Sequence, residues 1–405
     1  MNTCLRSICN MEVSSVSMPM SSKKIIQFIP ELDAGGAETV VKDYAIELHR
    51  QGYNVEVMVL LSNPNAANEK TIRNAGIPIV SLANSNQQVG QHKIFEILHK
   101  INRDIEIRKN LKKHLHENHP AVLHVHLNCM RFIMGCSKEL KDTKICFTCH
   151  SEPNAVFEQT GWRSLLENVS IRKYLKRGNL QIIALHKAAA LQVDKIFNIN
   201  TTTYLNNPLD IARFQMAAKE RGHYRKQLGI SENDFVLGHV GRFASVKNHQ
   251  FLVEVFASIC ERCENAKLLL VGSGVYLSSV QALLSKYGLA EKCIILSNRS
   301  DIPQLLAAMD VFCLPSKYEG MPVSLLEAQA AGKKCVVSNT VTKDVVVSNK
   351  VYYLGLNQPI HEWVDVILEN NAIAEPCAQT LNDFDITTVC NNLLSLYFGN
   401  DGEDE

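Results

Sequence analysis

Residues 310–327, DVFCLPSKYEGMPVSLLE, contain the pattern that decides the fold. Within them, VFCLP (311–315) is a short and nearly continuous apolar run, which is typical of a strand buried on both faces. A polar turn follows. From Pro322 onward the residues suit a helix, because proline is tolerated in the first turn, where its missing N–H costs nothing. The stretch therefore predicts one strand–turn–helix unit.

The same unit recurs on both sides of this stretch. Candidate strands lie at 25–29, 54–60, 77–82, 121–127, 144–150 and 180–185, and then at 235–241, 266–272, 293–297, 311–315 and 334–338. Apolar strands that alternate with helical segments are typical of parallel sheets covered on both faces. The predicted class is α/β, with two doubly wound, Rossmann-like domains facing an interdomain cleft.

These patterns also predict where the domains begin and end. The expected division is a disordered leader (1–22), an N-terminal domain (23–210), a C-terminal domain (211–375), a C-terminal crossover segment (376–398) and a disordered polar tail (399–405). The leader lacks the long apolar core of a secretory signal. The crossover segment contains the apolar helix ITTVCNNLLSLYF (386–398), which we expect to cross back to the first domain.

Composition excludes several other classes of protein. The chain has 405 residues, which at roughly 100–200 residues per domain predicts two or three domains. Its 42 basic and 41 acidic residues give a net charge of +1, which argues against a nucleic-acid coat. No apolar run is long enough to span a bilayer. The 13 cysteines have no regular framework, so we expect a reducing, cytoplasmic location.

Two carboxylates flank the start of the helix in the first-quoted stretch. Glu319 lies in the turn, Gly320 permits close approach of a ligand to the backbone, and Glu327 lies more than one turn into the helix. A helix N-terminus favours an anion such as a diphosphate, and carboxylates accept hydrogen bonds from sugar hydroxyls. The spacing equally allows a structural role, in which Glu319 caps the helix and Glu327 faces solvent.

The motif Glu319-Gly320-Met321-Pro322, with Glu327 as a second glutamate, resembles the signature of the retaining GT-B glycosyltransferases of family 4. The resemblance extends over residues 23–398 and is similar in pattern to capsular or exopolysaccharide assembly enzymes. Further segments that carry it are Gly35-Gly36-Ala37-Glu38, His239-Val240-Gly241-Arg242, Lys247-Asn248, Leu270–Gly274, Asp310–Ser316 and Ala328–Gly332. The linker 207–210 and the loop 339–344 depart from the family pattern, which leaves the donor sugar open.

The resemblance implies a site for the diphosphate and the nucleoside of a sugar donor. Arg242 and Lys247, next to the turn at Gly241, would neutralise the leaving nucleoside diphosphate. Glycosyl transfer builds negative charge on that group, and fixed cations stabilise it. Glu327 would accept hydrogen bonds from the ribose hydroxyls.

The resemblance also implies residues around the donor sugar. Glu319 would contact the sugar or its phosphate, and the backbone N–H groups of Gly320 and Met321 would point at the same region. Gly36 and His150 would approach from the other domain. Because the family is commonly explained by front-face attack, the resemblance implies no protein nucleophile. It implies no metal and no other cofactor.

The implied activity is metal-independent, retaining transfer of a sugar from a nucleoside diphosphate, expected to be UDP, to a saccharide hydroxyl. The expected acceptor is lipid-linked, and nucleic acid is not an expected partner. A nucleotide-sugar epimerase on the same fold and a sugar-nucleotide-binding protein without turnover remain alternatives. An NAD-dependent oxidoreductase is disfavoured, because residues 272–274 lack the full glycine fingerprint.

Three short patterns point to other chemistry. Residues 146–150 match the haem attachment pattern C-x-x-C-H, but in a strand the two cysteines face opposite sides. Residues 260–263 add a second C-x-x-C, and we interpret all these cysteines as free apolar residues rather than as a zinc site. Asp383-Phe384-Asp385 has the form of a metal-binding Asp-x-Asp, yet Asp385 is better placed as the N-cap of the following helix.

A basic amphipathic helix is predicted between Lys93 and His119, and a second basic cluster lies at 172–177. These segments either dock on an anionic membrane face that carries a lipid-linked acceptor, or form ordinary solvated helix surfaces. The first alternative predicts a peripheral position on the inner face of the plasma membrane.

Overall fold

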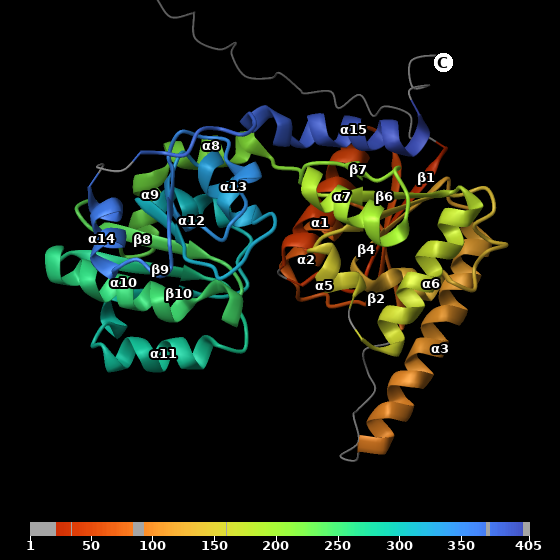
Figure 1. The fold of residues 1–405 in the computed structure, drawn as a ribbon, viewed down its shortest axis with the longest axis horizontal. Helices are drawn as coiled ribbons and strands as arrows, with labels where there is room; N and C mark the ends of the chain where they lie inside the picture. The colour runs from red at the N-terminus through yellow and green to blue at the C-terminus, as the bar shows by residue number, and fades with distance from the viewer. Residues whose placement is uncertain (1–21, 34, 84–92, 159, 370–372, 400–405) are drawn as a thin grey trace, which may run out of the picture.

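The structure, a computed structural model, describes residues 22–33, 35–83, 93–158, 160–369 and 373–399, and for residues 93–100 it describes the backbone only. The expected leader and tail lie outside the described residues, apart from Ser22 and Gly399. Two domains lie side by side, and one long helix joins them along one edge (Figure 1).

The N-terminal domain is built on seven parallel strands in the order β3-β2-β1-β4-β5-β6-β7. Its elements are β1 (Lys24–Ile29), α1 (Gly36–Arg50), β2 (Asn54–Leu61), α2 (Ala67–Asn74), β3 (Ile79–Ala83), α3 (Lys93–Asn118), β4 (Val122–His126), η1 (Leu127–Cys129), α4 (Met130–Ile133), β5 (Lys144–Cys149), α5 (Pro153–Phe157), α6 (Trp162–Arg177), β6 (Leu180–Ala184), α7 (Lys187–Phe197) and β7 (Thr203–Tyr204).

The C-terminal domain is built on six parallel strands in the order β10-β9-β8-β11-β12-β13. Its elements are α8 (Ile211–Lys219), α9 (Arg221–Gln227), β8 (Phe235–Val240), η2 (Ser245–Lys247), α10 (His249–Arg262), β9 (Ala266–Val271), α11 (Leu277–Lys286), η3 (Ala290–Lys292), β10 (Cys293–Leu296), α12 (Ile302–Ala308), β11 (Val311–Leu314), α13 (Val323–Ala330), β12 (Lys334–Ser338), η4 (Lys343–Val345), β13 (Val351–Leu354) and α14 (Ile360–Leu368).

The expected α/β class and the two doubly wound sheets are confirmed. Every predicted strand is present, because a strand covered by helices on both faces is predominantly apolar. Two strands were not predicted. β7 has only two residues, and β13 has two adjacent tyrosines at a partly exposed edge of its sheet.

The two faces of the N-terminal sheet carry separate cores. Cys146 packs with Val122 and Ile183 on one face, whereas Cys149 packs with Phe147 and Phe157 on the other. Successive side chains of a strand alternate between faces, so residues three apart are separated by the sheet. The two sulfurs of the C-x-x-C-H pattern therefore cannot reach one haem edge together.

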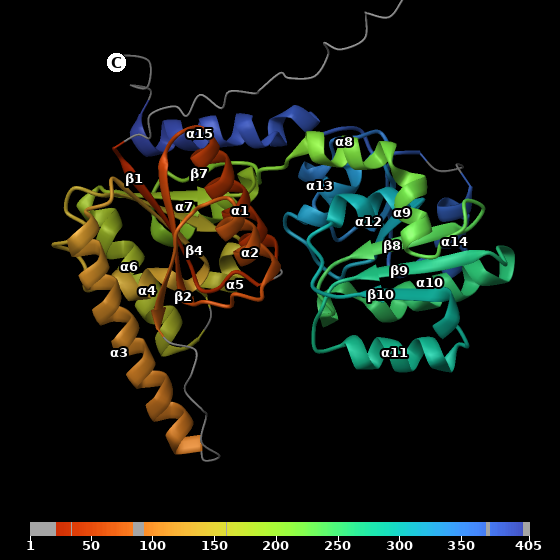
Figure 2. The ribbon, with the colours of Figure 1, turned by 180° about the vertical axis from the view of Figure 1, so that it is seen from behind.

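The crossover is made by η5 (Leu381–Phe384) and α15 (Ile386–Phe398), and Figure 2 shows α15 running along the N-terminal domain from the α8 side. Asp385 caps α15 by accepting hydrogen bonds from the backbone N–H groups of Thr387 and Thr388, at 3.0 and 3.4 Å. Asp383 is part of a capping box with Thr380. The Asp-x-Asp pattern thus has a capping role, as predicted for Asp385.

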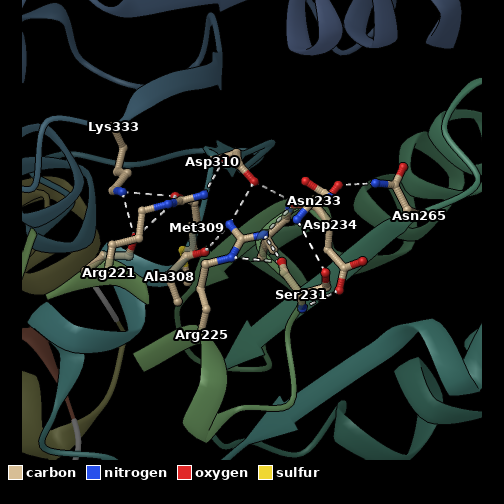
Figure 3. Close-up of polar contacts among 12 residues, drawn as sticks. Arg221, Arg225, Ser231, Asn233, Asp234, Asn265, Ala308, Met309, Asp310 and Lys333 are labelled. Atoms are coloured by element: carbon tan, nitrogen blue, oxygen red, sulfur yellow. Dashed lines mark hydrogen bonds and ion pairs between the residues drawn. The ribbon is translucent and has the colours of Figure 1, made fainter. Parts of the chain in front are cut away.

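A buried arginine organises the start of the C-terminal sheet (Figure 3). Arg225 of α9 has no exposed surface, and its guanidinium donates to the carbonyls of Ser231, Asp234 and Ala308. It also lies 3.4 Å from a carboxylate oxygen of Asp310. That oxygen in turn accepts from the backbone N–H of Val236 in β8. One side chain therefore connects α9, the end of α12 and the first strand.

Two further cations satisfy the last carbonyls of α12 beside Arg225. Lys333 donates to the carbonyls of Ala307 and Met309 at 3.0 and 2.9 Å, and Arg221 donates to the same two at 3.1 and 2.7 Å. Cations at a helix C-terminus are favourable because the carbonyl ends carry partial negative charge. Burial, with the nearby Arg221 charge, lowers the pKa of Lys333 to about 8.

Candidate functional site

A cavity of about 230 Å³ lies between the two domains, at the carboxyl ends of strands from both sheets. The residues after β5 and β6 form its N-terminal wall, and the stretch between β11 and α13 forms most of the opposite wall. Its lining residues are Cys149, His150, Ser151, Glu152, Leu185, His186, Ala189, Val246, Tyr318, Glu319, Gly320 and Met321. Ligands of open α/β sheets bind at this end of the strands.

Glu319 is held by a cation and a hydroxyl at the cavity wall. Its carboxylate lies 2.6 Å from Nζ of Lys247 and accepts a 2.9 Å hydrogen bond from Oγ of Ser316. Its backbone bridges to Val341, and α13 begins four residues later, after Pro322 as the N-cap. Glu319 therefore does not cap the helix, and the capping alternative is wrong.

At Gly320 the two domains approach each other closely. A Cβ at this position would lie 2.8 Å from Oε1 of Glu152, on the N-terminal domain. That carboxylate also lies 3.3 Å from Nε2 of His186. Burial, together with a hydrogen bond to Glu152, raises the pKa of Tyr318. The absence of a side chain at Gly320 thus lets the motif contact the other domain.

The position of Lys247 depends on two glycines in neighbouring turns. Gly272 has a φ of +154°, and a Cβ there would lie 2.0 Å from the carbonyl oxygen of Gly241. A Cβ on Gly241 would in turn lie 3.2 Å from Cε of Lys247. Since any larger residue would push these turns apart, the glycines fix the loop that presents Lys247 to Glu319.

Gly36 and Arg242 lie at a second contact between the domains, outside the cavity lining. A Cβ on Gly36 would lie 3.8 Å from Cγ2 of Val323, the first residue of α13. Burial raises the pKa of Glu38, and the charge of Arg242 partly offsets that effect. The glycine-rich segment at the start of α1 therefore faces the N-terminus of α13.

Glu327 is buried on α13, with 9% of its surface exposed, so the solvent-facing alternative is wrong. Burial raises its pKa to about 7, and the nearby Lys42 charge opposes the shift. Hydrogen bonds donated by a bound ligand would favour the ionised carboxylate and lower this pKa again.

His150 lines the cavity directly after β5. Its Nε2 lies 2.9 Å from Nδ1 of His126, and burial lowers the pKa of His150 to about 3. The ring is therefore neutral near pH 7, with one nitrogen bonded inside the domain.

The structure gathers part of the predicted set. His150, Glu319, Gly320 and Met321 line one cavity, and Lys247 joins them through Glu319. Four predicted residues do not line this cavity. Gly36, Arg242 and Glu327 lie near the contact between the N-terminal domain and α13, and Gly241 supports the Lys247 loop. Their roles with a ligand stay predictions.

The lining residues that the sequence reasoning missed include Glu152 and His186, which contact each other. They follow the carboxyl ends of β5 and β6 by two or three residues, which is where ligand-binding side chains concentrate. The rule that ligand-binding residues follow the carboxyl ends of parallel strands finds Glu152 and His186 when it is applied to β5 and β6.

Among the described residues, no group of three or more His, Cys, Asp or Glu side chains could hold a metal ion.

Comparisons with known proteins agree with this geometry. The family described as "Glycosyltransferase Family 4" matches residues 34–213, and the one described as "Glycosyl transferases group 1" matches residues 220–371. The glycosyltransferase named EpsF of Bacillus subtilis strain 168 is 24% identical over 365 residues, covering 89% of this chain and 90% of EpsF. An Escherichia coli galactosyltransferase named for the acceptor alpha-D-GlcNAc-diphosphoundecaprenol is 30% identical over 203 residues, covering 47% of this chain and 52% of that enzyme.

Solved structures share the fold. HepE of Anabaena in complex with UDP has a TM-score of 0.69 at 18% identity, covering 92% of this chain and 98% of HepE. WaaG, a glycosyltransferase of lipopolysaccharide biosynthesis, has a TM-score of 0.66 at 17% identity, covering 93% of this chain and 100% of WaaG. The arrangement is that of a GT-B glycosyltransferase, and the chain belongs to glycosyltransferase family 4.

Proposed function

We propose that this glycosyltransferase moves a sugar from UDP to a hydroxyl of a lipid-linked saccharide, with retention at the anomeric carbon and without a metal ion. The observation that carries the proposal is the interdomain cavity, in which Glu319, paired with Lys247, faces His150 across the strand ends of both domains. Solved complexes of HepE with UDP and with UDP-glucose support the choice of nucleotide.

The leaving diphosphate explains why a cation is held at the cavity wall. In the unliganded arrangement the Lys247 ammonium is neutralised by Glu319 at 2.6 Å. A diphosphate bound beside α13 would compete with Glu319 for Lys247. It would also pair with Arg242, which lies near Glu38 at the contact between α1 and α13. Charge that develops on the leaving phosphate is then stabilised by groups already in position, with water excluded between the domains.

The acceptor class is supported by the relatives and by the surface of the N-terminal domain. The Escherichia coli relative is named for a diphosphoundecaprenol-linked acceptor. On this chain, α6 exposes Trp162, Leu165 and Val169, which are spaced on one helix face, and α3 exposes Ile101 and Ile105. Both helices pack against α4 (Figure 2).

The same two helices also expose basic side chains, and we call the exposed apolar and basic residues of α3 and α6 together the α3–α6 face. The basic residues on the surface of the two helices are Lys109, Lys112, Lys113, Arg163, Arg172, Lys176 and Arg177. Exposed apolar residues together with Lys and Arg residues on the same helix are typical of helices that lie in an anionic lipid interface. Among the described residues, none of the helices has the length and apolar character needed to cross a bilayer. We infer peripheral docking through the α3–α6 face on the inner side of the plasma membrane.

Thermal unfolding in the presence of UDP, GDP, ADP and NAD, each with excess EDTA, tests the donor assignment. We expect UDP to stabilise the protein by roughly 2.7 kcal/mol at a hundredfold excess over its dissociation constant. At a fixed UDP concentration the stabilisation should increase from pH 6 to pH 8, because Glu327, with a pKa of about 7, must ionise to accept strong hydrogen bonds from ribose hydroxyls. In Glu327→Gln this increase should be lost, which separates it from ionisation of UDP itself.

The alternative functions predict different results in the thermal unfolding series and in a transfer assay with lipid-linked saccharides. Stabilisation by NAD alone would indicate a dehydrogenase. Turnover of a UDP-sugar without any acceptor would indicate an epimerase, and nucleotide binding without turnover in a broad acceptor panel would indicate a binding protein. Loss of UDP stabilisation in EDTA would refute metal independence.

Membrane docking can be measured from tryptophan fluorescence. The chain has two tryptophans, of which Trp162 is 56% exposed and Trp363 is fully buried. Vesicles of phosphatidylcholine with phosphatidylglycerol should shift the Trp162 emission to the blue and bind less protein as salt increases. Leu165→Ser should weaken binding, whereas Leu191→Ser, an exposed leucine on α7, should not. Equal binding of both variants, or none by the wild type, would contradict docking through this face.

A further inference from the structure

A chain of hydrogen bonds runs through the N-terminal domain from the crossover helix to the cavity. Nε2 of Gln27 in β1 donates to the hydroxyl of Tyr397 in α15 at 3.0 Å, and Oε1 of Gln27 lies 2.8 Å from Nε2 of His126. Nδ1 of His126 lies 2.9 Å from Nε2 of His150 at the cavity. The chain therefore joins a residue near the C-terminus to the candidate sugar site.

All members of the chain inside the domain are buried. Gln27 and His126 have no exposed surface, and Tyr397 is 4% exposed. Burial lowers the pKa of both His126 and His150, so each imidazole is neutral. A neutral imidazole has one N–H donor and one acceptor nitrogen, so each hydrogen bond fixes the direction of the next.

The direction starts at the amide of Gln27. Because its carbonyl oxygen only accepts, Nε2 of His126 carries the proton, and Nδ1 of His126 must accept. Nε2 of His150 then donates to it, which leaves Nδ1 of His150 unprotonated. Among the described residues, no hydrogen-bond partner is found for that nitrogen. His150 thus offers the cavity an acceptor, suited to a sugar hydroxyl.

Tyr397 is the group that keeps Gln27 in this orientation. Its hydroxyl accepts from Nε2 of Gln27, so the hydroxyl's own proton is left to donate to Nδ1 of His124, which lies 2.6 Å away. His124 in turn bonds Oγ1 of Thr148 at 2.7 Å. Without this hydroxyl, the Gln27 amide can turn over. Every later donor and acceptor would then be reversed, and Nδ1 of His150 would carry a proton.

We propose that Tyr397 is a positioning residue, which sets the tautomer of His150 through Gln27 and His126. The proposal rests on the proposed function, in which His150 contacts the donor sugar. It gives the crossover helix a role beyond joining the domains, because α15 supplies the hydroxyl that determines which hydrogen bond His150 offers to the substrate.

The tautomer can be measured by NMR of protein labelled with ¹⁵N-histidine at pH 7, with the His150 signals assigned from the spectrum of His150→Ala. We expect His150 to be neutral with its proton on Nε2, and to gain the Nδ1–H form in Tyr397→Phe. Tyr44→Phe is the matched control, since Tyr44 is a buried tyrosine of the same core whose ring lies beside His124, while none of the hydrogen bonds among Gln27, His126, His150 and Tyr397 involves its hydroxyl. A proton on Nδ1 in the wild type, or unchanged His150 signals in Tyr397→Phe, would overturn the proposal.

Kinetics separate a positioning role from a structural one. Tyr397→Phe should lower kcat by roughly tenfold and change the donor KM by less than about twofold, because the site is misaligned but still present. In a His150→Ala background the same substitution should have no further effect on kcat, since its target is gone. Equal losses in both backgrounds would overturn the proposal. A wild-type protein without transferase activity would instead refute the proposed function. The NMR result would still decide whether Tyr397 sets the tautomer of His150.

Discussion

Replacing Lys247 with alanine is expected to lower kcat for sugar transfer by about 10²–10³-fold, the loss typical of one group that stabilises transition-state charge. The structure holds its ammonium at the cavity wall, 2.6 Å from Glu319. Without it, the leaving diphosphate loses a cation and also faces the uncompensated Glu319 carboxylate. Steady-state transfer from UDP-sugar measures the effect.

Two controls make the Lys247 result specific. Lys317→Ala removes an exposed lysine close to Glu319 in sequence and should leave kcat within about twofold, because an exposed charge is well screened. Adding Glu319→Gln to Lys247→Ala should recover part of the loss if repulsion by the carboxylate contributes. An unchanged kcat in Lys247→Ala would remove Lys247 from the site and leave the diphosphate without its assigned partner.

Replacing Arg225 with leucine should destabilise the C-terminal domain by about 3–5 kcal/mol, the range expected when one partner of a buried charged group is removed. The side chain has no exposed surface and satisfies carbonyls of Ser231, Asp234 and Ala308 (Figure 3). Leucine fills much of the volume but leaves these oxygens and Asp310 without their donor.

Urea unfolding of this variant can be followed from Trp363, which is buried in the C-terminal domain, with Trp162 replaced by phenylalanine. Lys226→Leu is the matched control, because Lys226 is the next residue of α9 and is exposed. It should change the unfolding free energy by less than about 0.5 kcal/mol. A similar stability for both variants would mean that the Arg225 contacts contribute little.

Local sequence signals predicted the architecture well, for a physical reason. A parallel strand between two helical layers is predominantly apolar, so VFCLP and its counterparts are visible without any tertiary information. Asp385 could be predicted as a cap because the cap bonds are made within three residues. β7 and β13 escaped prediction, since a two-residue strand and a partly exposed edge strand lack that apolar signature.

The candidate site was predictable only where a motif marks it. His150 and Glu319 each lie just after a strand, within a motif that the sequence shows, and both line the same cavity. Glu152 and His186 lie at the same strand ends without a motif, and finding them requires knowing which strands are neighbours. The burial of Glu327, and with it the raised pKa, depends on how the two domains meet and cannot be derived from its neighbours in sequence.

By itself, then, the sequence determined two parallel-sheet domains, the turn that carries Glu319 and the cap that starts the last helix, because each depends on residues close together in the chain. Only the tertiary structure decided that Gln27 and Tyr397, separated by 370 positions, share a hydrogen bond behind His150. It also decided that Glu152 packs against Gly320. Such contacts arise from the packing of whole elements, and no local pattern of residue types encodes which buried polar groups will become partners.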